Sequence, residues 1–205
     1  AVLGDPMNSL MASRAAAGML APFGECGKAD RFFRFCRESL LQYPDFIKDL
    51  ISISDIPVYL SMKGSLMPSF SFRNDWEEQI RFFREENVPH EIWSPERCRQ
   101  LAPALAESCG EVIWVGEGQV NNREMHDALV TASEKLGVKI LEKNVTGFIH
   151  DSSALEAAVA GTLEVRGRKF VLASGSWSSQ LGDALDVSLP LKPIKGQMCR
   201  VQVED

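Results

Sequence analysis

The chain has 205 residues, of which 45% are apolar and 24% are charged, a globular composition large enough for one large core or two smaller ones. Its net charge of −6 and the absence of a Lys- and Arg-rich run argue against nucleic acid or an anionic membrane surface as a partner. No apolar run approaches the roughly 18 residues that a membrane-spanning helix needs, and the first residues lack the pattern of a secretory signal.

The thiol and imidazole groups show no metal-ligand spacing. The five cysteines are an odd number without a C-x-x-C pair, which predicts reduced thiols in a cytoplasmic protein. The three histidines are isolated from one another, so we expect no metal site.

The first third of the chain contains a run of small residues between apolar segments. Residues 1–3 are typical of the end of a buried strand, and residues 13–22 (S-R-A-A-A-G-M-L-A-P) carry almost no core-forming volume. Residues 28–50 have the apolar spacing of an amphipathic helix, which Pro44 is expected to break or restart. Residues 58–62 and 66–72 flank a Lys-Gly-Ser turn and predict a hairpin in which Pro68 lies at an edge or bulge.

Helix signals dominate the middle of the chain. Asn74 or Asp75 is expected to cap a helix over residues 76–87, and Ser94 followed by Pro95 predicts the start of another that ends near residue 103. Residues 123–136 predict a helix that stops at Gly137. The remaining strand candidates are residues 111–115, 138–141, 144–149, 162–165, 169–173 and 198–203.

No catalytic constellation is visible in the sequence. There is no G-x-S-x-G, no P-loop and no G-x-G-x-x-G, and the paired glutamates at 77–78 and 85–86 are typical of a solvated helix face. The residues alone indicate a mixed α/β protein with two turns that let a backbone approach a ligand closely, at 13–22 and 174–179. An ordinary packing turn is the alternative interpretation of each, and for residues 13–22 it is the one that composition alone favours.

Four stretches, taken together, resemble a known family. They are residues 13–22, 120–123 (V-N-N-R), 170–178 (F-V-L-A-S-G-S-W-S) and 191–197 (L-K-P-I-K-G-Q). Their order and spacing are similar to those of the FAD-dependent D-amino-acid oxidase family, and most of all to its glycine oxidases of the thiamine-biosynthesis type. The resemblance covers essentially the whole chain.

The resemblance implies a partial FAD-binding, Rossmann-like domain interleaved with part of an antiparallel substrate-binding sheet. The FAD-binding part would comprise residues 1–55 and 120–185, and the substrate-binding part residues 56–119 and 186–205. It also implies that the chain is a central fragment, with the G-x-G-x-x-G upstream and the last substrate-domain strands downstream. We therefore expect the 205 residues alone not to bind FAD, because the turn that binds the pyrophosphate lies outside them.

The resemblance also implies roles for particular residues. The segment from Arg14 to Met19 would lie along the pyrophosphate and the isoalloxazine, with Met19 on the substrate side. Val145 would offer its backbone to the adenine, and Gly196 and Gln197 would lie beside the flavin on the substrate side. The implied cofactor-binding residues are Arg14, Ala15, Ala16, Ala17, Gly18, Met19, Val145, Ala173, Ser174, Gly175 and Trp177.

Two residues depart from the family pattern. Such families place an acid at the end of the second strand, on the ribose hydroxyls, and this position is Gly4 here, with Asp5 one residue later. Arg14 stands where a small hydroxylated residue is commoner. Both departures concern the detail of the FAD contacts.

The implied activity is oxidation of a small amino acid or amine by hydride transfer to the flavin, followed by reoxidation with oxygen. No catalytic side chain is required, because the cofactor carries the chemistry and the protein orients the substrate. The alternatives are a sarcosine- or glycerol-phosphate-type flavin oxidoreductase and a cofactor-free binding domain that retains the fold. The substrate and the oligomeric state are left open, including whether the protein forms an oligomer.

Overall fold

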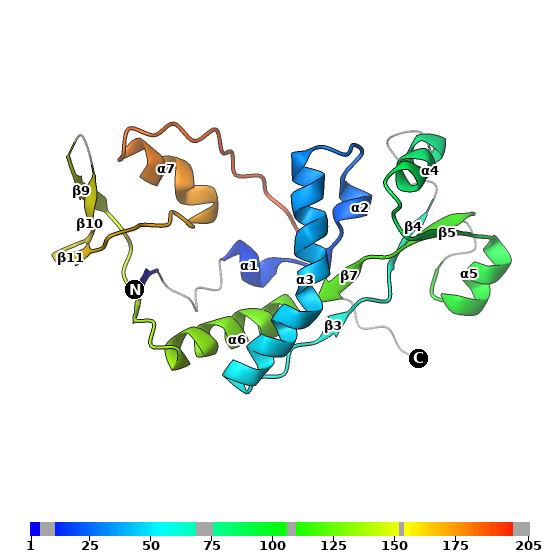
Figure 1. Cartoon of the computed structure of the whole chain (residues 1–205), viewed down its shortest axis with the longest axis horizontal. Coiled ribbons are helices and arrows are strands. Elements are labelled where there is room, and N and C mark those ends of the chain that lie inside the picture. Colours follow the sequence, from blue (N-terminus) through cyan, green and yellow to red (C-terminus); the bar gives the residue numbers. More distant parts are fainter. Residues whose placement is uncertain (5–10, 69–75, 106–109, 152–153, 199–205) are drawn as a thin grey trace. The chain divides into compact units, whose positions relative to one another are not determined.

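The computed structural model describes residues 1–4, 11–68, 76–105, 110–151 and 154–198. Helices and strands are intermixed along them (Figure 1), so the predicted mixed α/β class is confirmed. The chain divides into two compact units, one of residues 17–129 and one of residues 1–16 together with 130–205. The predicted four-part division into FAD-binding and substrate-binding segments stays a prediction.

The unit of residues 17–129 begins with a short strand and a short helix, followed by the longest helix. Its elements, in chain order, are β2 (Met19–Leu20), α2 (Pro22–Glu25), α3 (Arg31–Ser54), β3 (Leu60–Ser61), β4 (Ser65–Pro68), α4 (Trp76–Glu85), β5 (His90–Trp93), α5 (Pro95–Leu101), β6 (Val112–Val115), β7 (Gly118–Val120) and the first part of α6 (Asn122–Lys135).

Two small antiparallel sheets organise this unit, with strand orders β2-β7-β3 and β4-β6-β5. The register is continuous across the break between β3 and β4: Ser61 lies opposite Gln119, and Ser65 lies opposite Val115. Between these pairs, the Gly64 N–H donates to the Glu117 carbonyl at 3.1 Å. Residues 60–68 therefore run alongside residues 112–120 as one long, interrupted antiparallel pair.

An aromatic core lies between this pair and the helices. Phe33 of α3 and Phe83 of α4 are fully buried, and Ile113 and Val115 of β6 join the same cluster. The ring of Phe33 contacts Phe23 of α2 at a centroid distance of 6.0 Å and Phe82 of α4 at 5.2 Å, the latter edge-on. Burial of these large side chains is the main contribution that joins α2, α3 and α4 to the sheet.

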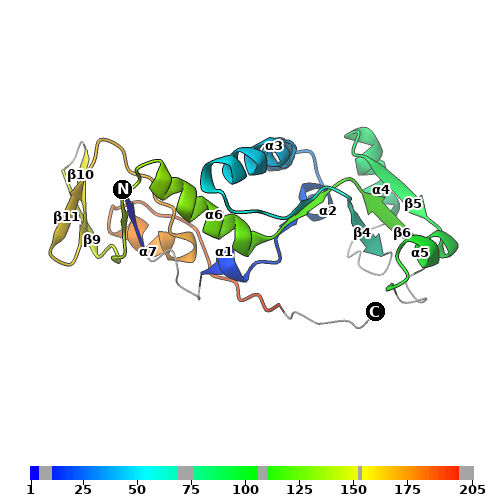
Figure 2. The same ribbon diagram turned by 90° about the horizontal axis from the view of Figure 1, so that it is seen from below.

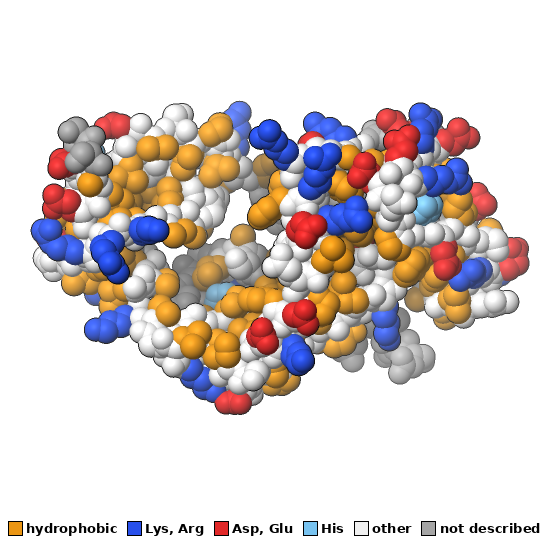
Figure 3. Space-filling view, viewed as in Figure 1, with side chains coloured by type: hydrophobic (Ala, Val, Ile, Leu, Met, Phe, Trp, Pro, Cys, Tyr) orange, Lys and Arg blue, Asp and Glu red, His pale blue; other side chains and the backbone are white. Residues whose placement is uncertain are grey.

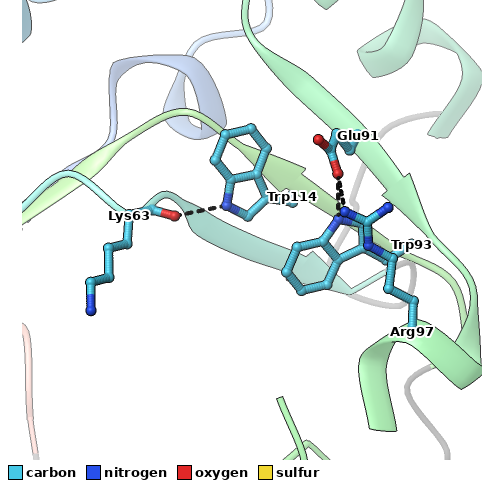
Figure 4. Close-up of polar contacts among 5 residues, drawn as sticks. All are labelled: Lys63, Glu91, Trp93, Arg97 and Trp114. Carbon is cyan, nitrogen blue, oxygen red and sulfur yellow. Dashed lines mark hydrogen bonds and ion pairs between the residues drawn. The ribbon is translucent and has the colours of Figure 1, made fainter. Parts of the chain in front are cut away.

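The other face of β4-β6-β5 carries two tryptophans (Figure 4). The Trp114 indole N–H donates to the Lys63 carbonyl at 2.8 Å, and the Trp93 indole N–H donates to Glu91 at 3.0 Å. Arg97 of α5 pairs with the same carboxylate oxygen at 2.6 Å and stacks over the Trp93 ring. About half of each charged side chain is exposed, so this ion pair contributes little stability and mainly orients α5.

The unit of residues 1–16 and 130–205 combines a parallel pair with an antiparallel sheet. Val2 of β1 (Val2–Leu3) lies opposite Ile140 of β8 (Ile140–Leu141) in parallel register. The three-stranded sheet has the order β11-β10-β9 (Figure 2). Its strands are β9 (Gly147–His150), β10 (Leu155–Ala160) and β11 (Leu163–Arg166), and the helices of the unit are α1 (Ala12–Ala15), η3 (Gly175–Trp177), α7 (Ser178–Asp183) and the end of α6.

Several sequence predictions are confirmed. The Ser94 hydroxyl accepts a hydrogen bond from the Arg97 N–H, and Pro95 is the first residue of α5. Gly137 follows α6 with a φ of +82°, the left-handed conformation that a helix-ending glycine adopts. Pro68 lies on β4, which is an edge strand.

Three predictions are wrong. The helix α3 does not break at Pro44. Proline has no N–H and so removes one backbone hydrogen bond from the helix, but the buried side chains of Leu40 before it and Ile47 after it hold the helix in place by packing. The segments 58–62 and 66–72 form no hairpin, since their described strands pair with β7 and β6 instead.

The third wrong prediction is the strand over residues 169–173. These residues form no ladder with any described strand, and the Val171 side chain is 89% exposed. A strand needs a neighbour to satisfy its backbone groups. Conversely, β5 and β10 were not predicted. The capping residues Asn74 and Asp75 and most of the predicted strand 198–203 lie outside the described residues.

The surface mixes exposed apolar side chains with charges of both signs (Figure 3). On α3, Phe32, Phe35 and Leu41 are more than 60% exposed. Where the structure describes a helix, none is both long enough and apolar enough to cross a bilayer.

Candidate functional site

The small-residue segment of residues 14–19 connects α1 to β2. α1 ends at Ala15, and Ala16 takes an extended conformation with φ −64° and ψ 155°. Arg14 is half-buried, whereas Ala15, Ala16 and Ala17 are all exposed. The Met19 side chain at the start of β2 is 64% exposed. The segment therefore presents backbone and methyl groups, followed by one exposed apolar side chain.

Gly18 fixes the end of this segment against the neighbouring strand. Its φ of +77° lies in the left-handed region, and a Cβ there would lie 2.0 Å from the Val120 carbonyl oxygen. The Val120 N–H donates to the Gly18 carbonyl at 2.9 Å. Backbone meets backbone at this point, and only glycine allows that approach. This contact explains why residue 18 is a glycine, independently of any ligand that the segment binds.

The start of α6 lies next to Val120 in the chain. The Asn121 side-chain oxygen accepts from the Arg123 N–H at 3.2 Å and from the Glu124 N–H at 3.4 Å, so Asn121 caps the helix. The Glu124 carboxylate accepts from the Tyr59 N–H at 2.8 Å. These contacts join α6, β7 and the residues before β3.

The second predicted cofactor turn lies at η3. Gly175 has a φ of +55° with nothing near the position of a Cβ, and Trp177 is 56% exposed. Ala173 is exposed, and the half-buried Ser174 hydroxyl lies 3.0 Å from that of Ser178. The turn is open on the side of Gly175 and Trp177, and the two hydroxyls fix it at its base.

The other predicted residues are spread along the same unit. Val145 is half-buried just before β9, and Gly196 and Gln197 are exposed in an irregular segment. Gly4 has a φ of +151°, and Asp5 lies outside the described residues.

The division between the two units falls inside the predicted flavin segment. Arg14 to Ala16 belong to one unit, with Val145, residues 173–177, Gly196 and Gln197, and Ala17 to Met19 belong to the other. The convergence of these residues on one cofactor stays a prediction.

Glu117 is a buried carboxylate that the sequence did not reveal. It lies in the turn between β6 and β7, and its side chain is only 1% exposed. Its Oε1 atom accepts from the Phe23 N–H and the Gly24 N–H, each at 2.7 Å. A glutamate between two glycines after a strand is typical of an exposed turn. Its partners lie 94 and 93 residues away in the chain, so no local pattern could have shown its burial.

The environment of Glu117 sets its protonation. Burial raises the pKa of its carboxyl group above the ordinary value of 4.5, while the hydrogen bonds from Gly24, Phe23 and the Ser65 side chain oppose the shift. The neighbouring charge of Glu25 adds to the rise of this pKa. The folded chain therefore holds a proton on Glu117 to higher pH than the unfolded chain does.

Replacing Glu117 by Gln is expected to remove this pH dependence. A raised folded pKa gives a stability contribution that is fully present below the unfolded pKa of 4.5 and is lost as pH rises through the folded pKa. The difference in unfolding free energy, wild type minus Glu117→Gln, should therefore decrease in urea titrations as pH rises above the unfolded pKa of 4.5. The exposed Glu111→Gln is the control. A difference that grows with pH would contradict this assignment.

The described cysteines and the described metal-ligand side chains indicate no second site. Burial, with Cys36 and nearby acids as smaller causes, raises the pKa of the Cys26 thiol, which disfavours the nucleophilic thiolate. The described cysteines Cys26, Cys36 and Cys98 are free thiols. No group of three or more His, Cys, Asp or Glu side chains could hold a metal ion there. The cytoplasmic location stays a prediction from composition.

The family model described as "FAD dependent oxidoreductase" matches residues 7–205, nearly the whole chain. The chain belongs to this family. The family name gives FAD as the cofactor, and the exposed small-residue segments lie within the matched range.

Relatives within this FAD-dependent family include thiamine-biosynthesis proteins and glycine oxidases. The bifunctional protein ThiO/ThiG of Trichormus variabilis is 28% identical over 95% of this chain and 29% of its own length. The glycine oxidase of Geobacillus kaustophilus is 26% identical over 93% of this chain and 52% of its own length. The crystal structure of glycine oxidase from Geobacillus kaustophilus superposes with a TM-score of 0.81 at 24% identity, over 91% of this chain and 51% of that one.

These matches confirm the predicted fold: the chain has the fold of the corresponding part of glycine oxidase. It spans about half the length of the glycine oxidases and under a third of the bifunctional relative.

Proposed function

We propose that the whole protein to which this chain belongs oxidises a small amino acid or amine, with FAD as hydride acceptor and oxygen as the final electron acceptor. The observation that carries the proposal is the segment from Arg14 to Met19, where three exposed alanines lead to a glycine held against Val120. Membership of the FAD-dependent family and the glycine oxidase relatives support it.

The described residues fit such a cofactor. A flat ring and a pyrophosphate need backbone that no large side chain covers, and Ala15, Ala16 and Ala17 provide it. The open turn at Gly175 has the same character, since nothing lies within 4 Å of a Cβ position there. Arg14 to Met19, Val145 and residues 173–177 are the groups that would hold FAD.

Bound FAD would supply the redox chemistry, as hydride acceptor for the substrate carbon with oxygen as the final electron acceptor, so that the products would be an imine and hydrogen peroxide. The residues of the chain would bind the cofactor and orient the substrate. The positive guanidinium of Arg14 suits the pyrophosphate. Met19, with Gly196 and Gln197, would face the substrate, and its apolar side chain would exclude water from that side.

The proposal predicts peroxide release when the flavin-loaded whole protein is given glycine, sarcosine or D-amino acids. A coupled peroxidase assay measures it, and the amine that supports the highest kcat/KM identifies the substrate class. If the amine is oxidised with an artificial electron acceptor but no peroxide forms, oxygen is not the natural electron acceptor. Failure with all these amines under both conditions would contradict the proposed activity and favour the binding-domain alternative.

Substituting Met19 tests the placement of the flavin. Met19→Asp puts a charge beside the proposed ring and is expected to lower flavin occupancy or turnover about tenfold or more, because a carboxylate resists desolvation there. Leu41→Asp is the matched control, since Leu41 is 62% exposed in the same unit but lies outside the proposed site. Equal effects of the two substitutions would contradict the role of Met19.

A further inference from the structure

Glu117 is a buried carboxyl group for which the proposed chemistry has no use. A carboxylate that is 1% exposed must be hydrogen-bonded for its burial to be tolerated. The hydrogen-bond donors to its side chain therefore indicate the structural role of Glu117.

The side chain of Glu117 binds the start of α2. Pro22, the first residue of this helix, has no N–H, and the next two backbone donors, of Phe23 and Gly24, both point to Oε1 of Glu117 at 2.7 Å. The first N–H groups of a helix have no acceptor within it. Bonds of this length to a carboxylate are charge-assisted and stronger than neutral ones.

Residues on either side strengthen this attachment. The Ser65 side chain hydrogen-bonds the Glu117 carboxylate, and the Gln79 side chain donates to the Phe23 carbonyl at 3.3 Å. Phe23 itself is 4% exposed and packs on Phe33. The start of α2 is thus held by Glu117, by a hydrogen bond from α4 and by the aromatic core, and Ser65 of β4 in turn binds Glu117.

The position of α2 determines the position of β2, because only Ala21 separates them. β2 pairs with β7 through two residue pairs, Met19 with Gln119 and Leu20 with Gly118. So short a ladder specifies its register weakly. The approach of Gly18 to Val120 closes one end of the pair, and Glu117, directly before β7, anchors the chain just beyond the other.

We propose that Glu117 is a positioning residue, which through α2 holds β2 and Met19 in the place that the proposed oxidation requires. The inference rests on the proposed function for the role of Met19, but the attachment of α2 by Glu117 is independent of it. Displacement of a substrate-facing group by about 1 Å is enough to lower turnover about a hundredfold.

Two substitutions in the flavin-loaded whole protein test the inference. Glu117→Gln keeps an oxygen that can accept both N–H groups, so turnover per bound flavin should stay within about threefold of wild type. Glu117→Ala leaves both groups unpaired and should lower kcat per bound flavin about tenfold or more, with a smaller change in KM. The exposed Glu111→Ala is the control and should leave both parameters unchanged.

Amide hydrogen exchange tests the attachment without any activity. In Glu117→Ala, the amides of Phe23, Gly24 and Val120 should exchange about tenfold faster or more, while those of Val112 and Ile113 in β6 stay protected. Unchanged exchange at these three amides would overturn the inference, even if the wild type is no oxidase. Faster exchange with unchanged kcat and KM per bound flavin would overturn it as well, because Glu117 would then serve stability alone.

Discussion

Gly18→Ala should destabilise the unit of residues 17–129 by about 3 kcal/mol. The left-handed conformation costs an L-residue about 1 kcal/mol or more, and overpacking against a neighbour that cannot give way adds about 2 kcal/mol. The neighbour is the Val120 carbonyl oxygen, 2.0 Å from the new Cβ, and it belongs to the backbone of β7. Relief of the clash requires β2 to separate from β7, so a lower free energy of unfolding should be measured in denaturant titrations of the chain.

Gly137→Ala separates these two contributions. Gly137 has nearly the same φ, +82°, but nothing lies within 4 Å of its Cβ position. Its substitution should cost only about 1 kcal/mol, from conformation alone. Equal losses for the two variants would show that the contact with Val120 is unimportant. In the whole protein, Gly18→Ala should also reduce flavin retention, whereas Gly137→Ala should not.

The elements that the sequence predicted well are those with signals in neighbouring residues. Ser94 and Pro95 start α5, and Gly137 ends α6, because a cap is made within a few residues of the group it satisfies. The mixed α/β class and the family followed from similar local strings, such as residues 13–22 and 170–178.

Predictions failed where distant segments decide the structure. Residues 58–68 form an apparent hairpin locally, but the strands of residues 112–120 provide better partners for both halves. Residues 169–173 have strand composition, yet they form no ladder with a described strand. Pro44 would end an isolated helix, but the tertiary packing of Leu40 and Ile47 outweighs the lost backbone bond.

In the candidate site, too, features with local sequence signals were predicted and features that depend on distant residues were not. The alanines, Gly18 and the turn at Gly175 were singled out from small-residue strings and a family resemblance; the structure shows the alanines and the turn exposed, and Gly18 packed against Val120. Glu117 could not be predicted, because its burial depends on the first turn of α2 more than 90 residues earlier. Long-range polar contacts of this kind leave no periodicity in a sequence.

Phe33→Ala should destabilise the unit of residues 17–129 by about 4 kcal/mol, a usual cost when a buried aromatic residue is replaced by alanine. Phe33 is fully buried and contacts rings on both α2 and α4, so its loss leaves a cavity between three helices. Denaturant titration measures the change. The cavity lies beside Phe23, which Glu117 holds in place, so amide exchange at Phe23 and Gly24 should also accelerate.

Phe32→Ala is the matched control on the adjacent residue of α3. Phe32 is 66% exposed, so its removal should change stability by no more than about 0.5 kcal/mol. The two substitutions delete the same side chain from the same helix and differ only in burial. A comparable loss for both would mean that Phe32 is buried against another surface in the whole protein. A loss below about 1 kcal/mol for Phe33→Ala would contradict the aromatic core as the contact that joins α2, α3 and α4.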